Sequence, residues 1–214
     1  GLGGPDAVAR HHKEGRLTIR ERISGLVDQR SFQEVGTLTG QGRYEGGRLV
    51  GVTPAPYVMG LAEIDGRPVA VGGEDFTIRG GTSASGERRK GGQGGFIEDL
   101  AASYRIPLVN LIDGAGGSVG SIRRRGYAVL PGIHGFDRSV ELMGKVPVVN
   151  AVLGTAAGGP AGRAILAHWS VMVSGTSQIF AAGPPVVERS LGQKLTKEEL
   201  GGPEVAVDTA VFAT

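Results

Sequence analysis

Residues 146–162 read VPVVNAVLGTAAGGPAG, an apolar run that passes into a stretch with hardly a side chain larger than a methyl group. The run over 146–153 has the length and composition of a buried strand. Gly158 and Gly159 then mark a turn, and Pro160 suits the first turn of a helix. The segment therefore predicts a buried strand that turns through two glycines into a helix.

Glycine accounts for 39 of the 214 residues and clusters mostly beside strand-like runs. One such strand-like run is the apolar segment 107–112, which is followed closely by the glycines within 114–117. Amphipathic patterns predict helices over 96–106 and near 136–143, so strand, glycine turn, helix and strand recur at a spacing of about 40 residues. This rhythm is typical of βαβ units and predicts an α/β fold with a largely parallel core. No linker-like segment interrupts it, so we expect one domain over 1–214.

The first part of the chain, residues 1–30, predicts helical structure. Thr18 followed by Glu21 fits a capping box at the start of a helix. The apolar residues expected to share one face are Leu17, Ile23, Leu26 and Val27. We therefore expect a helical N-terminal segment that packs against the rest of the domain.

Other local signals predict strands. The dipeptide Asp65-Gly66 lies between two strand-like runs and suits the two-residue turn of a β-hairpin. Short strands are expected at 171–174 and 178–182, followed by a helix from Pro185. These elements continue the alternation of strands and helices.

Composition excludes several classes of protein. A formal net charge of +2 is too mild to indicate a nucleic-acid partner, and the absence of cysteine excludes disulfides and thiolate metal sites. No apolar run approaches ~18 residues, and the N-terminus lacks a signal-peptide pattern, so we expect no membrane span and a cytoplasmic location. The histidines show no metal-like spacing with carboxylates and are interpreted as structural or surface residues. They are His11, His12, His134 and His168.

One alternative function follows from residues 116–120, which read GGSVG and satisfy the G-x-S-x-G pattern of a nucleophile elbow. In that interpretation Ser118 is the nucleophile of a serine hydrolase. Asp137, His134 and His168 are available as the acid and the base of a triad. The pattern is short and the chain is rich in glycine, so a chance match is easy.

The turn at 158–159 has two interpretations. Small residues allow a helix to pack closely on a sheet. Alternatively, unpaired backbone N–H groups after the strand, with no side chains in the way, donate to a reacting carbonyl and stabilise an enolate or tetrahedral oxyanion by several kcal/mol. The basic cluster of Arg88, Arg89 and Lys90 is similarly either a solvated helix end or a phosphate contact.

Several segments, in this order, resemble one family: GRLTIRERISGLVD, IDGRPVAVGGEDFTIRGG, PLVNLIDGAGG, GTAAGGPAGRA and VMVSGTSQIFAAGPPVVERSLGQKLTKEELGG. The chain resembles the N-terminal half of the carboxyltransferase β subunit of biotin-dependent acyl-CoA carboxylases, of the propionyl-CoA and methylcrotonyl-CoA carboxylase type. The resemblance covers nearly the whole chain. It implies a crotonase-like (ClpP/crotonase-type) ββα superhelix.

The resemblance also implies a reaction, in which a carboxyl group moves from N-carboxybiotin to the α-carbon of an acyl-CoA. It assigns stabilisation of the enolate to the backbone N–H groups of Gly158 and Gly159. It assigns acyl-CoA binding to Ala157, Gly116, Gly117, Arg88, Arg89 and Lys90. Biotin is expected on a partner protein, acyl-CoA as substrate, and no metal in this domain.

The implied partners are a biotin carboxyl carrier, a biotin carboxylase component, the C-terminal carboxyltransferase half and further copies of the subunit. The glycine-rich segment after the apolar run 107–112 departs from the family. Residues 114–119 read Gly-Ala-Gly-Gly-Ser-Val, where relatives commonly have Ser-Gly-Gly-Ala-Arg. The 214 residues contain one such half, so we expect this chain alone to carboxylate poorly. The alternatives to a carboxylase are the carboxyltransferase of a biotin-dependent acyl-CoA or malonate decarboxylase, the Ser118 hydrolase, and an inactive scaffold half.

Overall fold

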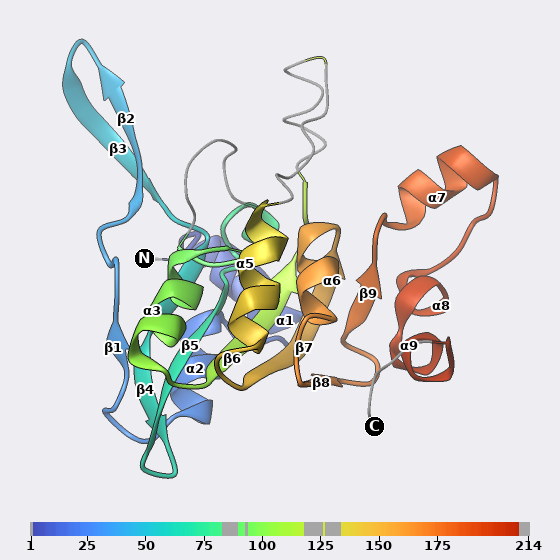
Figure 1. Ribbon diagram of the computed structural model, residues 1–214. Coiled ribbons are helices and arrows are strands. Elements are labelled where there is room, and N and C mark those ends of the chain that lie inside the picture. The colour runs from blue at the N-terminus through green and yellow to red at the C-terminus, as the bar shows by residue number, and fades with distance from the viewer. Residues whose placement is uncertain (1, 83–89, 93, 118–125, 127–133, 210–214) are drawn as a thin grey trace.

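The computed structural model describes residues 2–82, 90–92, 94–117, 126 and 134–209 (Figure 1). Within them, the main sheet has seven strands in the order β1-β4-β5-β6-β7-β8, and β9 also pairs with β7. The strands are β1 (Gln33–Glu34), β4 (Tyr57–Ile64), β5 (Arg67–Glu74), β6 (Leu108–Gly114), β7 (Val148–Ala157), β8 (Trp169–Met172) and β9 (Gln178–Phe180).

The pairs β5–β6, β6–β7, β7–β8 and β7–β9 are parallel, whereas β1–β4 and β4–β5 are antiparallel. Helix α3 (Phe96–Tyr104) connects β5 to β6, and α5 (His134–Met143) lies between β6 and β7. With α6 (Gly159–Ala164), these helices cover one face of the sheet, while α1 (Pro5–Lys13) and α2 (Ile19–Leu26) lie on the other (Figure 1). The predicted α/β fold with a largely parallel core is confirmed.

Burial on both faces explains why β6 and β7 are so apolar. On one face, Leu108 and Val148 pack with Ile97 of α3 and Leu142 of α5. On the other face, Ile19 and Ile23 of α2 form a separate cluster with residues of the sheet such as Val71 and Leu111. The central strands therefore lie between two hydrophobic layers.

The N-terminal segment forms two helices where one helical region was predicted. Thr18 caps α2 and makes the predicted capping box with Glu21. The predicted apolar face is wrong in part, because Leu17 is 55% exposed while Ile19 and Ile23 are buried. Leu17 precedes the cap, so it is outside the helix whose face it was expected to share.

The β4–β5 hairpin confirms the turn predicted at Asp65-Gly66. Both residues have positive φ, 51° and 70°, as a two-residue turn of this kind requires. The carboxylate of Asp28 accepts hydrogen bonds from both of their backbone N–H groups, at 3.0 and 2.7 Å. The end of the N-terminal segment is thereby attached to this hairpin.

The predicted strands and helices elsewhere are present, with changed limits. Strand β7 continues to Ala157, four positions beyond the predicted end at 153. The reason is tertiary: residues 155–157 pair with β9, a strand more than twenty positions later in the chain. In α3, Tyr104 was expected with the apolar cluster and is instead 62% exposed at the end of the helix.

The remaining elements extend from this body. The β2–β3 hairpin (Gly40–Glu45 and Arg48–Pro54) projects from one side of the sheet, and the 3-10 turn η1 (Arg79–Gly81) follows β5 (Figure 1). On the opposite side are α7 (Pro184–Leu191), α8 (Lys197–Gly201) and α9 (Pro203–Thr209). Among the described residues, no helix is both long enough and apolar enough to cross a bilayer.

Candidate active site

Two glycine-rich turns lie together at the carboxyl ends of neighbouring strands. The first glycine turn (residues 114–117) follows β6, and the second glycine turn (residues 157–159) follows β7, which is parallel to β6. A Cβ atom placed on Gly116 would lie 2.4 Å from the carbonyl oxygen of Ala157 and 3.6 Å from the nitrogen of Gly158. The two backbones therefore touch, and only glycine fits between them. The carboxyl edge of a parallel sheet is where ligands bind in such folds.

The second glycine turn reverses the chain from β7 into α6. Gly158 has φ 63° and ψ −118°, a conformation that side chains oppose. Its N–H donates to the carbonyl of Phe180 at 3.1 Å, which continues the pairing of β7 with β9. Gly159 donates no backbone hydrogen bond to any described residue, and Pro160, which follows it, has no N–H. Of the two predicted donors, Gly159 is therefore the one whose N–H no described residue occupies.

The first glycine turn is held from the opposite side. Gly116 has φ 74°, and its carbonyl accepts a hydrogen bond of 2.8 Å from the Thr82 hydroxyl. The N–H of Ala115 donates to the carbonyl of Gly80 at 2.8 Å. A Cβ placed on Gly117 would meet no described atom within 4 Å. Gly116 is thus packed, whereas Gly117 faces open space beside the second turn.

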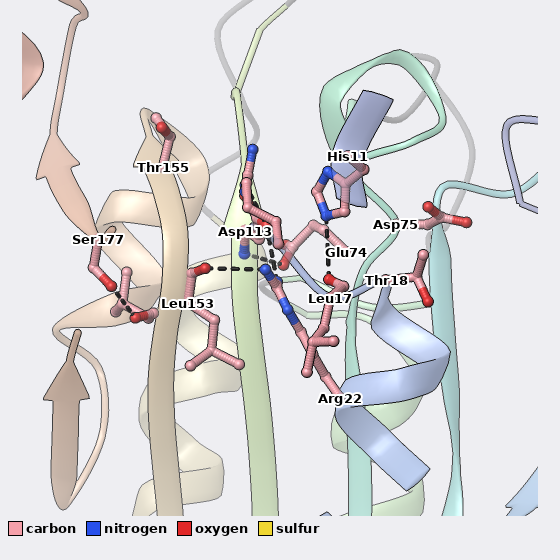
Figure 2. A network of polar contacts seen from close by, with 12 residues as sticks. His11, Leu17, Thr18, Arg22, Glu74, Asp75, Asp113, Leu153, Thr155 and Ser177 are labelled. Atoms are coloured by element: carbon pink, nitrogen blue, oxygen red, sulfur yellow. Dashed lines mark hydrogen bonds and ion pairs between the residues drawn. The ribbon is translucent and has the colours of Figure 1, made fainter. Parts of the chain in front are cut away.

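A buried carboxylate lies directly beneath the first turn. Asp113 is fully buried at the end of β6, and Nη2 of Arg16 lies 2.5 Å from both of its carboxylate oxygens. Arg22 of α2 donates to Asp113 Oδ2 at 2.8 Å and to the carbonyl of Leu153 at 3.0 Å (Figure 2). Arg22 therefore links Asp113, near the end of β6, to the middle of β7, and Arg16 adds a second guanidinium to the same carboxylate.

A second buried ion pair joins β5 to α6. Glu74, the last residue of β5, pairs with Arg163, and both side chains are almost completely buried. Burial opposes the charge on the guanidinium, but the attraction of and hydrogen bond to Glu74, together with Tyr57 and Glu98, outweigh it and raise the pKa of Arg163. Glu74 also accepts a hydrogen bond of 3.3 Å from the N–H of Asp113.

His11 and His12 agree with their interpretation as structural and surface residues. His11 is buried, its Nε2 lies 3.1 Å from the carbonyl of Leu17, and its ring stacks on Phe76. Burial lowers the pKa of His11, with a further lowering from the neighbouring guanidinium of Arg16. His12 lies at the surface, 2.9 Å from a carboxylate oxygen of Glu21.

The predicted basic cluster is described only at Lys90, since Arg88 and Arg89 are outside the described residues. Lys90 is 8% exposed, donates to the carbonyl of Gly36 at 3.0 Å and lies 3.8 Å from Glu34. Burial lowers its pKa. Its aliphatic chain lines a mainly apolar cavity of about 320 Å³. Lys90 is therefore anchored against β1 rather than standing free on the surface.

The residues of the alternative hydrolase are not assembled by the described part of the chain. Ser118 is outside it, as is the side chain of His134. Nδ1 of His168 accepts a hydrogen bond of 3.0 Å from the N–H of Val148, so this ring supports the start of β7. Nor do the described residues gather three or more metal-binding side chains in one place.

Sequence reasoning missed the charged residues behind the turns: the buried Glu74, Asp113 and Arg163, and the partly buried Arg16 and Arg22. The available signal was position, because Glu74 and Asp113 each end an apolar strand beside glycines. A charged side chain in that place is buried only if a partner arrives from elsewhere. Those partners are 89 to 97 positions away in the sequence.

The sheet, its covering helices and the paired glycine turns define a crotonase-type fold, as the solved structures of similar shape show. The chain belongs to the carboxyl transferase domain family, whose match spans residues 10–210. The predicted crotonase-like fold and the predicted family are both confirmed.

Curated relatives agree. The carboxyltransferase subunit of propionyl-CoA carboxylase from Haloferax mediterranei is 33% identical over an alignment of 217 positions, which covers 99% of this chain and 41% of the relative. The mitochondrial propionyl-CoA carboxylase β chain of Homo sapiens is 33% identical over an alignment of 205 positions, which covers 94% of this chain and 36% of the relative. The chain thus spans about two fifths of the length of these relatives.

Solved structures give the same picture. A transcarboxylase 12S, described as a hexamer with methylmalonyl-coenzyme A bound, matches with a TM-score of 0.75 at 27% identity, over 96% of this chain and 39% of its own. A single-chain, multi-domain long-chain acyl-CoA carboxylase matches with a TM-score of 0.76 at 31% identity, over 94% of this chain and 20% of its own.

Proposed function

We propose that this chain supplies the acyl-CoA side of a carboxyltransferase, which moves a carboxyl group from N-carboxybiotin to the α-carbon of an acyl-CoA. The observation that carries the proposal is the open N–H of Gly159 beside the first glycine turn, in a chain of the carboxyl transferase domain family. Loss of the α-proton moves negative charge onto the thioester oxygen. A fixed N–H donor at that oxygen stabilises the enolate more than the ground state.

The small residues of both turns fit a thioester. Ala157, Gly158 and Gly159 place no bulky side chain before the donor, so the oxygen can reach the backbone. Gly116 supports the carbonyl of Ala157, and Gly117 offers an open surface for the acyl end of the substrate. In this scheme Gly158 acts through its turn geometry, and Gly159 is the donor.

For the coenzyme A moiety we retain the basic cluster as the phosphate contact. Arg88 and Arg89 carry that role, because their guanidinium groups suit phosphate oxygens. Lys90 contributes by anchoring the cluster to β1 through Gly36 and Glu34. Charge reversal at Arg88 and Arg89 should then weaken coenzyme A binding more than binding of a short acyl-pantetheine.

Biotin belongs on a carrier protein, and when bound it supplies the carboxyl group. We propose that the carrier, a biotin carboxylase and the C-terminal carboxyltransferase half complete the enzyme, in a homo-oligomer located in the cytoplasm. In this chain, the N–H of Gly159 holds the thioester oxygen, and the small residues 157–159 leave room for that oxygen to reach it. The biotin-side groups are assigned to the other half.

A pair of substitutions at one position tests the donor. Gly159→Pro removes the N–H at the first position of α6, where proline is accepted, and Gly159→Ala keeps it. In the assembled enzyme, measured as transfer of labelled bicarbonate into acyl-CoA, Gly159→Pro should lower kcat about 100- to 1000-fold, as loss of an oxyanion donor does elsewhere. Gly159→Ala should retain most of the activity. Equal activity of the two variants would remove Gly159 from the mechanism.

A further inference from the structure

Glu74 contacts the elements that carry both glycine turns. Its side chain, 5% exposed, leaves the end of β5 and accepts a hydrogen bond from the N–H of Asp113, next to the first turn. The same carboxylate pairs with Arg163 of α6, the helix that begins at Gly159.

The packing around Glu74 leaves it little freedom. A Cβ placed on Gly114 would lie 3.2 Å from Cγ of Glu74 and 3.0 Å from Cγ of Pro160. A Cβ placed on Gly81 would lie 2.9 Å from Cβ of Glu74. Glycines on two sides thus make room for the glutamate stem, and Pro160 of the second turn's helix lies against the first turn.

Arg163 is oriented chiefly by this carboxylate. Its backbone carbonyl accepts a hydrogen bond of 2.8 Å from Asn150 of β7, which fixes the end of α6 on the sheet. Its Nε has no hydrogen-bond partner among the described residues, so the pairing with Glu74 is the main polar contact of the guanidinium.

A buried ion pair of this kind is weak support for stability, because the cost of removing two charges from water offsets most of their attraction. Apolar residues of similar volume often stabilise a fold as well. The location of the pair, directly behind both turns, therefore points to geometry rather than to stability.

We infer that Glu74 is a positioning residue: by holding Asp113 and Arg163 together, it fixes the second glycine turn relative to the first and aims the Gly159 N–H at the thioester oxygen. This inference rests on the proposed function. A displacement of about 1 Å between the turns is enough to lower a rate about 100-fold.

Three variants of the assembled carboxyltransferase test it. Glu74→Gln removes the charge with little change in shape. Glu74→Gln combined with Arg163→Met also removes the guanidinium that would otherwise remain buried and unpaired. Glu63→Gln makes the same chemical change at an exposed position of β4 and serves as the control. For each we measure kcat and KM for acyl-CoA, together with the melting temperature.

Glu74→Gln should lower kcat about 10- to 100-fold while KM for acyl-CoA changes less than about threefold. The double variant should recover the melting temperature and keep the low kcat, because the position of the turns is not restored. Glu63→Gln should behave as the wild type. If Glu74→Gln folds poorly, the kcat of the folded double variant tests the inference instead. A wild-type kcat in that variant overturns the inference.

A combination with Gly159→Pro separates positioning from general structure. If Glu74 acts through the Gly159 N–H, Glu74→Gln should lower kcat less than about threefold further in the Gly159→Pro background. Full additivity would assign Glu74 a structural role and overturn the inference. Failure of the proposed function is distinguishable, because the wild-type assembly would then transfer no carboxyl group to acyl-CoA.

Discussion

The two glycine turns end neighbouring parallel strands, yet their backbones are held in different ways. The first turn is fixed through Gly116, which is packed against Ala157 and bonded to Thr82. The second turn is fixed through the N–H of Gly158, which is bonded to Phe180 of β9. Similar composition therefore gives one turn that supports and another that leaves a donor open at Gly159.

The charges behind the two turns differ as well. Asp113, beneath the first turn, receives two arginines from the N-terminal segment, whereas Arg163, behind the second, depends on Glu74. The first turn is thus anchored to the N-terminal segment, and the second to the end of β5, which β6 separates from β7 in the sheet. Both turns are rich in glycine, so what distinguishes them is the set of charged contacts that holds each one in place.

Removal of the Asp113 charge should have the largest effect on this arrangement. Asp113→Asn leaves the partly buried Arg16 and Arg22 without their carboxylate, and loss of one partner from a buried ion pair costs about 3–5 kcal/mol. Denaturant unfolding should show this loss. The matched control is Asp65→Asn, at an exposed turn position, where a change below about 0.5 kcal/mol is expected. Equal stabilities of the two variants would contradict the anchoring role.

Within the first turn, two alanine substitutions should separate support from binding. Gly116→Ala forces a Cβ into the carbonyl of Ala157 at positive φ, so it should cost about 1–3 kcal/mol of stability and lower kcat by displacing the second turn. Gly117→Ala meets no described atom, so it should leave unfolding unchanged and raise KM for acyl-CoA. The comparison fails if Gly117→Ala destabilises the fold as much as Gly116→Ala.

A change remote from both turns should have the smallest effect and a distinct pH dependence. The hydrogen bond with His12, and then those with Thr18, lower the pKa of Glu21 from 4.5 to about 2. Because the folded-state pKa is the lower one, Glu21 stabilises the protein above about pH 4.5, and this contribution disappears as the pH falls toward about 2. Glu21→Gln should therefore destabilise the capping box at pH 7 but not near pH 2, with kcat unchanged throughout. A loss of stability that is the same at both pH values would assign the effect to something other than this carboxylate.

Much of the fold could be predicted from local patterns. The Thr18–Glu21 capping box, the Asp65-Gly66 turn and the helix at 96–104 depend on residues within a few positions of one another. The prediction failed at the end of β7 for a distant reason, because residues 155–157 pair with β9, and at Leu17 for a local one. Leu17 was assigned to a buried face that belongs to Ile19 and Ile23, because the cap restarts the helix after it.

The candidate site shows the same division. The glycines of both turns were recognised from the sequence, which also led to the proposal of a backbone donor at 158–159. The choice of Gly159 over Gly158 was not, because it depends on Phe180, which lies 22 positions beyond Gly158 and pairs with it only in the folded sheet.

The sequence by itself determined the strands, the turns and the absence of large side chains at residues 157–159, since periodicity, capping and glycine content act over short distances. Only the tertiary structure decided which N–H remains open and which charges lie behind it. Glu74 meets Arg163, and Asp113 meets Arg16 and Arg22, across 89 to 97 positions of chain. Long-range contacts of this kind follow from strand order and packing, which a single local pattern does not contain.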